Sequence, residues 1–391
     1  MSGAAGSSAV SGALSRERLR AGATIVSASV VPVILAFFVG GLIIAILGRN
    51  PFSFYGDMIQ RGLLDSNGLQ ESIIRMAPLL LIAAGLIVAF KAGLWNLGAD
   101  GQFLLAAAFA AGLAPSLVGS IGVAPTLIAM LVLAAIVGAA WTLVPALLRA
   151  KYGVNEIITT LMMSFIGIGL ANLLVKGPFQ TDVGGVARTD TLQVEDRLPD
   201  LFGTRIHSGI IIALAAIIAV HVVMTRTSLG LRLQILGANM PGAVHAGLKP
   251  AKLIVVAFLV SGAMIGLAGA VEILGVTGSF RVDFNPAWGL LVIPLVFLAR
   301  LNALASIGFV ALFSVVQIGG ETASREADIS SDFLLALFGL VLLFMAITEY
   351  LRQRRGSTAY LPSQGAAPGP AEPEPDEPDP SGPLAPQEGA R

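Results

Sequence analysis

Polar residues that could contact a solute inside a membrane gather in a short glycine-rich stretch. The segment 93–102 reads GLWNLGADGQ and carries Asn96, Asp100 and Gln102 immediately before a helix of small residues. Amide and carboxylate groups supply hydrogen-bond donors and acceptors, and polar sequence at membrane depth is tolerated only where protein or a cavity satisfies it. A simpler interpretation is an interfacial turn that places Asp100 near a helix N-terminus.

Further polar side chains stand at the ends of other apolar runs. Asn155 and Glu156 begin the stretch GVNEIITTLM, where they could equally cap a helix and favour its first turn. Glu272 lies near the outer end of a continuous apolar run, so it is a functional candidate that could also simply face water. The polar residues that are candidates for contact with a solute are Asn96, Asp100, Gln102, Asn155, Glu156, Asn172 and Glu272.

Composition places the chain in a membrane. It has 391 residues, of which 55% are hydrophobic and 12% charged, whereas soluble proteins have roughly 25% charged residues. The mean hydropathy is +0.83. A formal net charge of zero gives no reason to expect nucleic-acid binding, and the absence of cysteine excludes disulfides and thiolate metal sites. We expect no metal site, because His207, His221 and His245 show no ligand spacing.

The apolar runs predict an all-α, polytopic membrane protein with about ten transmembrane helices. Arginines before the first run and after the last one place both termini in the cytoplasm. Residues 1–22 would be a cytoplasmic N-terminal segment, 23–351 the transmembrane domain and 352–391 a disordered cytoplasmic tail. The expected helices are 23–47, 72–90, 103–117, 126–148, 155–175, 208–225, 253–274, a pair of short helices within 288–318 that meet near Arg300, and 333–350.

Several details of this topology are specific enough to test. We expect residues 50–71 to form a polar outer segment, 176–207 a long outer loop, and 319–332 the last outer loop. The spacing of Gly262, Gly266 and Gly269 predicts that their helix approaches its neighbours closely, as small residues one turn apart allow in lipid.

The segment 225–252, TRTSLGLRLQILGANMPGAVHAGLKPAK, is a long basic interruption between two apolar runs. Its basic residues place it on the cytoplasmic side, and glycine and proline divide it into two short helical pieces, 229–234 and 243–248. A pair of short helices at the membrane surface would suit docking to another protein. By pattern alone, however, any cytoplasmic loop of this length in a polytopic protein would look similar.

The order of residues in this loop resembles the coupling loop of a family of ATP-driven importers. The family consists of ABC permease subunits that serve ribose, branched-chain amino acids and nucleosides, and GLWNLGADGQ resembles its second signature, with Asp100 where glutamate is commoner. Gln234 and Ile235 replace the arginine and alanine expected after Arg232. The resemblance implies that the loop sits in a cleft of the ATPase through Gly230, Arg232, Gly237, Asn239, Ala243, Ala246 and Gly247.

This resemblance implies a permease subunit of an importer in the plasma membrane that translocates a small polar solute. The polar candidates named above would line its translocation path. The chain lacks a G-x-x-x-x-G-K-[ST] loop, so we expect no catalytic residues and no bound cofactor, with ATP used by a separate ATPase subunit. The other implied partners are a second homologous permease, an extracytoplasmic substrate-binding lipoprotein and membrane lipid.

The substrate class is less sharply indicated. The start GVNE at 153–156 and the long outer loop resemble the branch that imports nucleosides with a basic membrane lipoprotein, with simple sugars as the alternative. A secondary transporter would fit the composition equally well, but few charges lie within the helices to relay protons or bind a coupling ion.

Overall fold

The computed structural model describes residues 30–181, 185–330 and 332–357, and in these ranges the chain is helical with no β-sheet. Within these ranges, seven helices are long and apolar enough to cross a membrane: α3 (Ser66–Lys91), α4 (Ala99–Ile121), α5 (Val123–Tyr152), α6 (Glu156–Lys176), α7 (Gly209–Arg226), α10 (Pro250–Glu272, continued by η3 Ile273–Thr277) and α12 (Ala303–Glu326). Three shorter apolar helices are Val30–Ile46, α11 (Trp288–Leu298) and the part of α13 (Asp332–Ser357) up to Thr348. Each of the ten expected apolar segments falls on one of these helices.

The chain divides into two compact units, Met1–Thr348 and Glu349–Arg391. The second unit is described only as far as Ser357, where α13 ends. The predicted N-terminal segment 1–22 and nearly all of the predicted tail lie outside the described residues, so the boundaries and the cytoplasmic position of the termini stay predictions.

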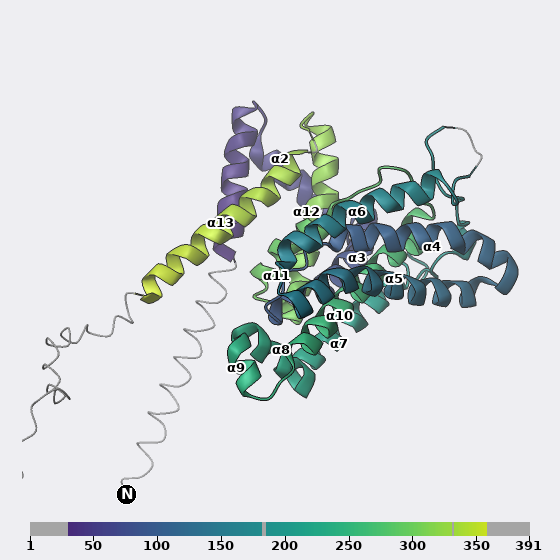
Figure 1. The fold of residues 1–391 in the computed structure, drawn as a ribbon. Coiled ribbons are helices and arrows are strands. Elements are labelled where there is room, and N and C mark those ends of the chain that lie inside the picture. The colour runs from purple at the N-terminus through teal and green to yellow at the C-terminus, as the bar shows by residue number, and fades with distance from the viewer. Residues whose placement is uncertain (1–29, 182–184, 331, 358–391) are drawn as a thin grey trace, which may run out of the picture. The chain divides into compact units, whose positions relative to one another are not determined.

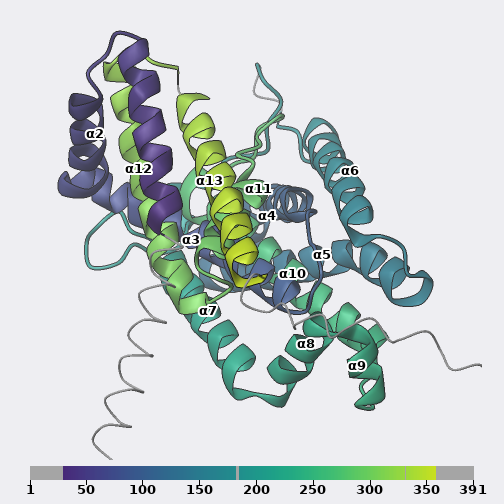
Figure 2. The same ribbon diagram turned by 90° about the vertical axis from the view of Figure 1, so that its left-hand side faces the viewer.

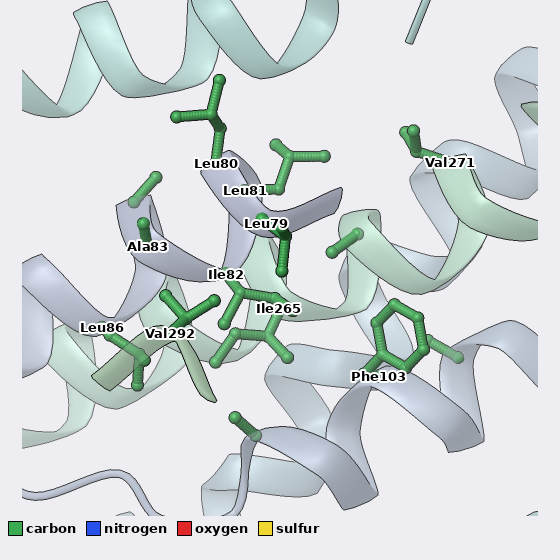
Figure 3. Close-up of a cluster of buried hydrophobic side chains, with 14 of the residues drawn as sticks. Leu79, Leu80, Leu81, Ile82, Ala83, Leu86, Phe103, Ile265, Val271 and Val292 are labelled. Atoms are coloured by element: carbon green, nitrogen blue, oxygen red, sulfur yellow. The ribbon is translucent and has the colours of Figure 1, made fainter. Parts of the chain in front are cut away.

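Helix α10 stands at the centre of the first unit, where it packs against α3, α4 and α5 (Figure 1). Side chains from four helices meet there, among them Leu79 and Ile82 of α3, Phe103 of α4, Ile265 of α10 and Val292 of α11 (Figure 3). Helix α3 is buried almost all round from Ala77 to Phe90. A helix that is apolar on every face belongs in such a position, and we call this group of side chains the central cluster.

Glycines let α10 approach its neighbours backbone to backbone. A Cβ added to Gly262 or Gly266 would collide with backbone of α5, at Gly138 and Ala134 respectively. A Cβ on Gly269 would collide with the carbonyl of Phe103 in α4. The close packing predicted from the glycine spacing is therefore confirmed, and it involves two different neighbouring helices.

A second group of apolar side chains forms a peripheral cluster. It joins four helices that lie side by side in Figure 2, namely the helix Val30–Ile46, α2 (Pro51–Ile59), α12 and α13. Its side chains include Ala36, Phe54, Val316 and Leu337. Phe338 of α13 packs against both clusters. The first unit thus contains two apolar cores that meet between α11, α12 and α13.

The segment 319–332 is only in part the loop that the sequence predicts, and the polar segment 50–71 is helical. Residues 50–71 form α2, the π-helical turn η1 (Gln60–Leu64) and the start of α3. Helix α12 continues eight residues past Ile318 into the expected outer loop. Both polar stretches are helical because they pack on each other: Gly62 and Gly319 bring their backbones together, and Arg61 pairs with Glu326 at 2.9 Å.

The inner turn before α12 agrees with the prediction. Helix α11 ends at Leu298, and Arg300 and Leu301 take left-handed backbone conformations with φ of 52° and 56°. Asn302 then caps α12 by accepting a hydrogen bond from the Leu304 amide at 3.0 Å. Helix α11 is therefore a short helix that enters this turn, as expected. The second short helix of the predicted pair is wrong, because α12 runs for 24 residues and its polar end packs on α2 and η1.

The segment 176–207, which the sequence predicts to be a long outer loop, is hydrogen-bonded to the chain that follows α10. Backbone amides of Thr189, Leu192 and Leu198 donate to the carbonyls of Phe280, Gly278 and Leu274 at 2.8–3.0 Å. Near its end, burial lowers the pKa of His207, and the carboxylate of Asp200 opposes that shift. These hydrogen bonds hold the loop against the end of α10 and η3.

Candidate functional site

The basic segment 225–252 folds into two short helices, α8 (Ser228–Ala238) and α9 (Met240–His245), as its sequence predicts. The Thr227 hydroxyl caps α8 by accepting from the Gly230 amide at 3.2 Å, and Asn239 caps α9 by accepting from the Gly242 amide at 3.0 Å. Figure 1 shows the pair beyond the ends of α7 and α10. Since α7 begins where the loop 176–207 ends, the α8–α9 pair lies at the opposite end of the membrane helices from that loop.

Backbone contacts attach α8 to the membrane helices. A Cβ on Gly237 would lie 2.7 Å from the amide nitrogen of Gly93, in the turn after α3, where Gly93 itself has φ of 71°. A Cβ on Gly230 would collide with the end of α7. The Gln234 amide donates to the Met224 carbonyl at 2.6 Å. Gly230 and Gly237 therefore allow contacts that any larger residue would break.

The residues predicted to couple to an ATPase divide into two groups in space. Arg232, Asn239, Ala246 and Gly247 lie on the exposed surface of the α8–α9 pair. Gly230 is buried, and Ala243 has no exposed surface at all, so it packs against this chain itself. Gly237 is open on one side and contacts the turn at Gly93 on the other. Their predicted role at an ATPase stays a prediction.

The segment 93–102 folds back beside the middle of α10. The Asn96 amide group donates to the Ser261 hydroxyl at 2.9 Å and to the Gln102 carbonyl oxygen at 3.1 Å. In return the Gln102 amide donates to the Asn96 carbonyl oxygen at 2.9 Å. Both side chains are fully buried, with exposures of 0% and 1%. The two amides therefore form a reciprocal pair that ties the turn to the centre of the bundle.

Asp100 joins the N-termini of two helices. It lies in the first turn of α4, and its carboxylate accepts from the Gly289 amide of α11 at 2.7 Å. A Cβ on Gly289 would crowd Asp100, so only glycine allows this approach. Both helix dipoles present their positive ends to the carboxylate, which stabilises a buried negative charge. The local interpretation, an acid near a helix N-terminus, is thus part of what the structure shows.

The remaining predicted path residues lie apart from this group. Asn155 caps α6 by accepting from the Ile157 amide at 2.9 Å, and the buried Glu156 pairs with Arg149 at 3.2 Å. At the other end of α6, Asn172 exchanges hydrogen bonds with Asp283 in the segment before α11. The structure therefore brings together Asn96, Asp100 and Gln102, and it leaves the other candidates at separate places.

Glu272 has a companion that the sequence reasoning missed. Its side chain is 3% exposed and lies within electrostatic reach of Arg75 in α3. The Arg75 guanidinium also stands 4.8 Å from the ring centre of Trp288, over its face. A lone arginine inside an apolar run could have been recognised as the partner of the lone glutamate in another run.

Small hydroxyl residues of α6 were also missed. The Thr160 hydroxyl accepts from the Leu97 amide at 3.1 Å, and the Ser164 hydroxyl accepts from the Gly101 amide at 3.0 Å. Serine and threonine in an apolar helix carry little signal in the sequence, so their partners could not be read from it. Within the described ranges no group of three acidic, histidine or cysteine residues is placed to hold a metal ion.

Comparison with known families identifies this arrangement. A family model described as the permease component of the branched-chain amino acid transport system matches residues 68–346. The match includes the segments 93–102 and 225–252 and all seven membrane-crossing helices of the described ranges, apart from the first two residues of α3. The chain belongs to this permease family.

Relatives of the permease include transporters of two solute classes. It is 33% identical to a glucose ABC transporter permease protein of Haloferax volcanii, over 85% of this chain and 90% of that one. It is 27% identical to a guanosine ABC transporter permease protein of Bacillus subtilis, over 82% and 93%, and 26% identical to a nucleoside ABC transporter permease protein of Lactococcus lactis, over 81% and 89%. No solved structure matches the permease.

The family assignment made from the sequence is therefore confirmed. The chain is a multi-pass protein of the plasma membrane and the permease component of an ABC transporter for sugars or nucleosides.

Proposed function

We propose that this permease imports a neutral nucleoside and that a separate ATPase subunit drives it by docking on the α8–α9 pair. The observation that carries the docking proposal is the pair itself. Its surface presents Arg232, Asn239, Ala246 and Gly247, while Gly230 and Gly237 fix it to α7 and to the turn after α3. Because the α8–α9 pair is attached to the membrane helices, a docked partner that displaces the pair would displace these helices as well.

Two arguments support a nucleoside as the substrate: the solutes of the relatives and the scarcity of fixed charges along the path. Two of the named relatives are permeases for guanosine or nucleosides, and a neutral ring needs hydrogen-bonding groups and apolar walls more than fixed charges. Glucose is the second candidate, because the glucose permease relative shares the larger fraction of identical residues. The proposed assembly also includes a second homologous permease and an extracytoplasmic lipoprotein that delivers the solute to the outer loop.

Uptake of labelled solutes tests the substrate. Cells with and without this gene and its partner genes would be given adenosine, guanosine, uridine, ribose and glucose. We expect nucleoside uptake to depend on the gene, because the transporter is the only entry route that the deletion removes. If glucose or ribose uptake alone depended on the gene, the nucleoside would be wrong and the importer would stand.

The orientation has its own test, which the cysteine-free chain makes simple. Val194 in the outer loop is 72% exposed and Val244 on α9 is 56% exposed. We expect a cysteine at Val194 to react with a membrane-impermeant maleimide in intact cells, and a cysteine at Val244 to react only after permeabilisation. Thr189 is a poor probe despite its place in the same loop, because it is buried and accepts from the Phe280 amide. The opposite labelling pattern would put the α8–α9 pair outside and exclude ATPase docking there.

A further inference from the structure

A stripe of polar residues on α12 is incompletely bonded. Of the five buried side-chain polar atoms that lack a hydrogen-bond partner in the described part of the chain, three lie on this helix: Ser314 Oγ, Gln317 Oε1 and Ser324 Oγ. Their spacing of three and seven residues puts them on one face of the helix. Buried polar groups are normally bonded, so each of these atoms calls for an explanation.

The same helix lines a cavity of about 240 Å³ between α11, α12 and α13. Phe313, Gln317, Glu321 and Arg325 succeed one another at intervals of four residues along its wall, and Phe338 closes the α13 side. Gln317 is nine residues before the end of α12, which places it about 13 Å inside that end at 1.5 Å per residue. The cavity therefore reaches from the outer end of α12 toward the depth of the bundle.

The surroundings of the cavity argue against a lipid contact. A wall that carries Gln317, Glu321, Arg325 and Asp332 is too polar to face hydrocarbon, where such groups are expensive. The cavity also lies where the two apolar cores meet, since Phe313 belongs to the central cluster and Leu334 to the peripheral one. Polar surface at a junction between two separately packed groups of helices is suited to a water-filled passage whose width can change.

The chemistry of the lining points to the occupant. The rings of Phe313 and Phe338 lie 4.2 Å apart at 31° and offer an apolar wall, against which a flat ring can pack. Gln317 lines the cavity, and its Oε1 atom is a buried acceptor without a donor from the described residues. The Glu321 carboxylate, which has no hydrogen bond or ion pair to another described residue, accepts from hydroxyl or N–H groups.

We infer that this cavity is a binding site for the transported solute, in which a nucleoside packs its base against Phe313 and Phe338 and donates hydrogen bonds to Gln317 and Glu321. The inference rests on the proposed function and adds to it the position of the solute within this chain. None of these residues is among the path residues suggested by the sequence, and the site lies apart from the bonded group around Asn96.

A cysteine at Leu335 can report on the site. Leu335 lines the cavity and is 53% exposed, and its replacement leaves Gln317 and Glu321 in place. In the assembled transporter, saturating guanosine should slow maleimide modification of Leu335→Cys by about tenfold, because a site filled about nine-tenths of the time reacts at about a tenth of its free rate. A cysteine at Val194, in the outer loop, should react at the same rate with and without guanosine.

Variants in the reporter background test the proposed contacts. Gln317→Leu should reduce protection by guanosine to less than about twofold, since loss of about 1.4 kcal/mol, the size of one such contact, weakens binding tenfold. Gln60→Leu, at an exposed glutamine of η1, should leave protection unchanged. If Gln317→Leu failed to reach the membrane, Glu321→Gln would serve instead, because it keeps the shape of the side chain and removes its charge.

The outcomes separate this inference from the proposed function. Guanosine uptake that depends on the gene, together with an unprotected Leu335→Cys, would overturn the site and leave the importer. Full protection in both Gln317→Leu and Glu321→Gln would show that the solute makes other contacts. Protection by glucose and not by guanosine would overturn the nucleoside as the occupant.

Discussion

A leucine at Gly266 should remove most of the folded permease from the membrane. A Cβ at this position would collide with the Ala134 carbonyl and lie 3.0 Å from its carbon, and both are backbone atoms of α5. Because no side chain can rotate out of the way, the two central helices must separate. Overpacking of a core costs typically about 1–3 kcal/mol and sometimes more. The amount of protein in the membrane fraction and the melting temperature of the purified permease would measure this effect.

The matched control is the same substitution on a different helix. Gly169 lies in α6, it is exposed, and a Cβ added to it would meet no other atom within 4 Å. Gly169→Leu should therefore leave both the amount and the melting temperature close to those of the wild type. Equal melting temperatures for Gly266→Leu and Gly169→Leu would contradict the packing of α10 on α5.

An aspartate at Ala246 should abolish transport and leave the permease inserted. Ala246 directly follows α9 on the exposed surface of the α8–α9 pair, so the new carboxylate faces water in the free permease. In a docked complex it would lose that water, and an unpaired buried charge costs on the order of several kcal/mol. Since each loss of about 1.4 kcal/mol weakens binding tenfold, the ATPase should no longer co-purify with the permease.

Two comparisons keep this result interpretable. Ala246→Ser changes the size and charge of the side chain little, so it should retain the ATPase and transport at nearly the wild-type rate. The Ala246→Asp variant should be present in the membrane at the wild-type amount, which separates docking from folding. Wild-type transport and co-purification by Ala246→Asp would remove the α8–α9 pair as the docking surface.

Much of the helical layout could be predicted from hydropathy and glycine spacing alone. The apolar runs located the membrane helices, and the punctuation by Gly237 and Pro241 located the division between α8 and α9. These features are local, because a helix in lipid must satisfy its own backbone and a glycine or proline acts at its own position. The polar outer helices α2 and η1 escaped prediction because their stability comes from packing on α12, which is distant in sequence.

The candidate site was predicted less completely for the same reason. Asn96, Asp100 and Gln102 stood out because they lie close together in one polar segment. Their partners Ser261 and Gly289 belong to α10 and α11, and nothing in the local sequence marks either one as a partner. Gln317 was likewise hidden, since a single glutamine in an apolar helix gains meaning only when its missing partner and the adjoining cavity are seen.

The contact between Gly93 and Gly237 has a mechanical consequence. Where two helices touch through side chains, a change of rotamer can absorb a small displacement. A contact between two backbones cannot adjust in this way. A shift of α8 would therefore be passed at nearly full amplitude to the turn after α3, and from there to Asn96, three residues along the chain and hydrogen-bonded to the middle of α10. The permease thus has a stiff connection from its surface to the centre of its helix bundle. The stiffer this connection is, the larger is the part of a displacement of α8 that reaches α10.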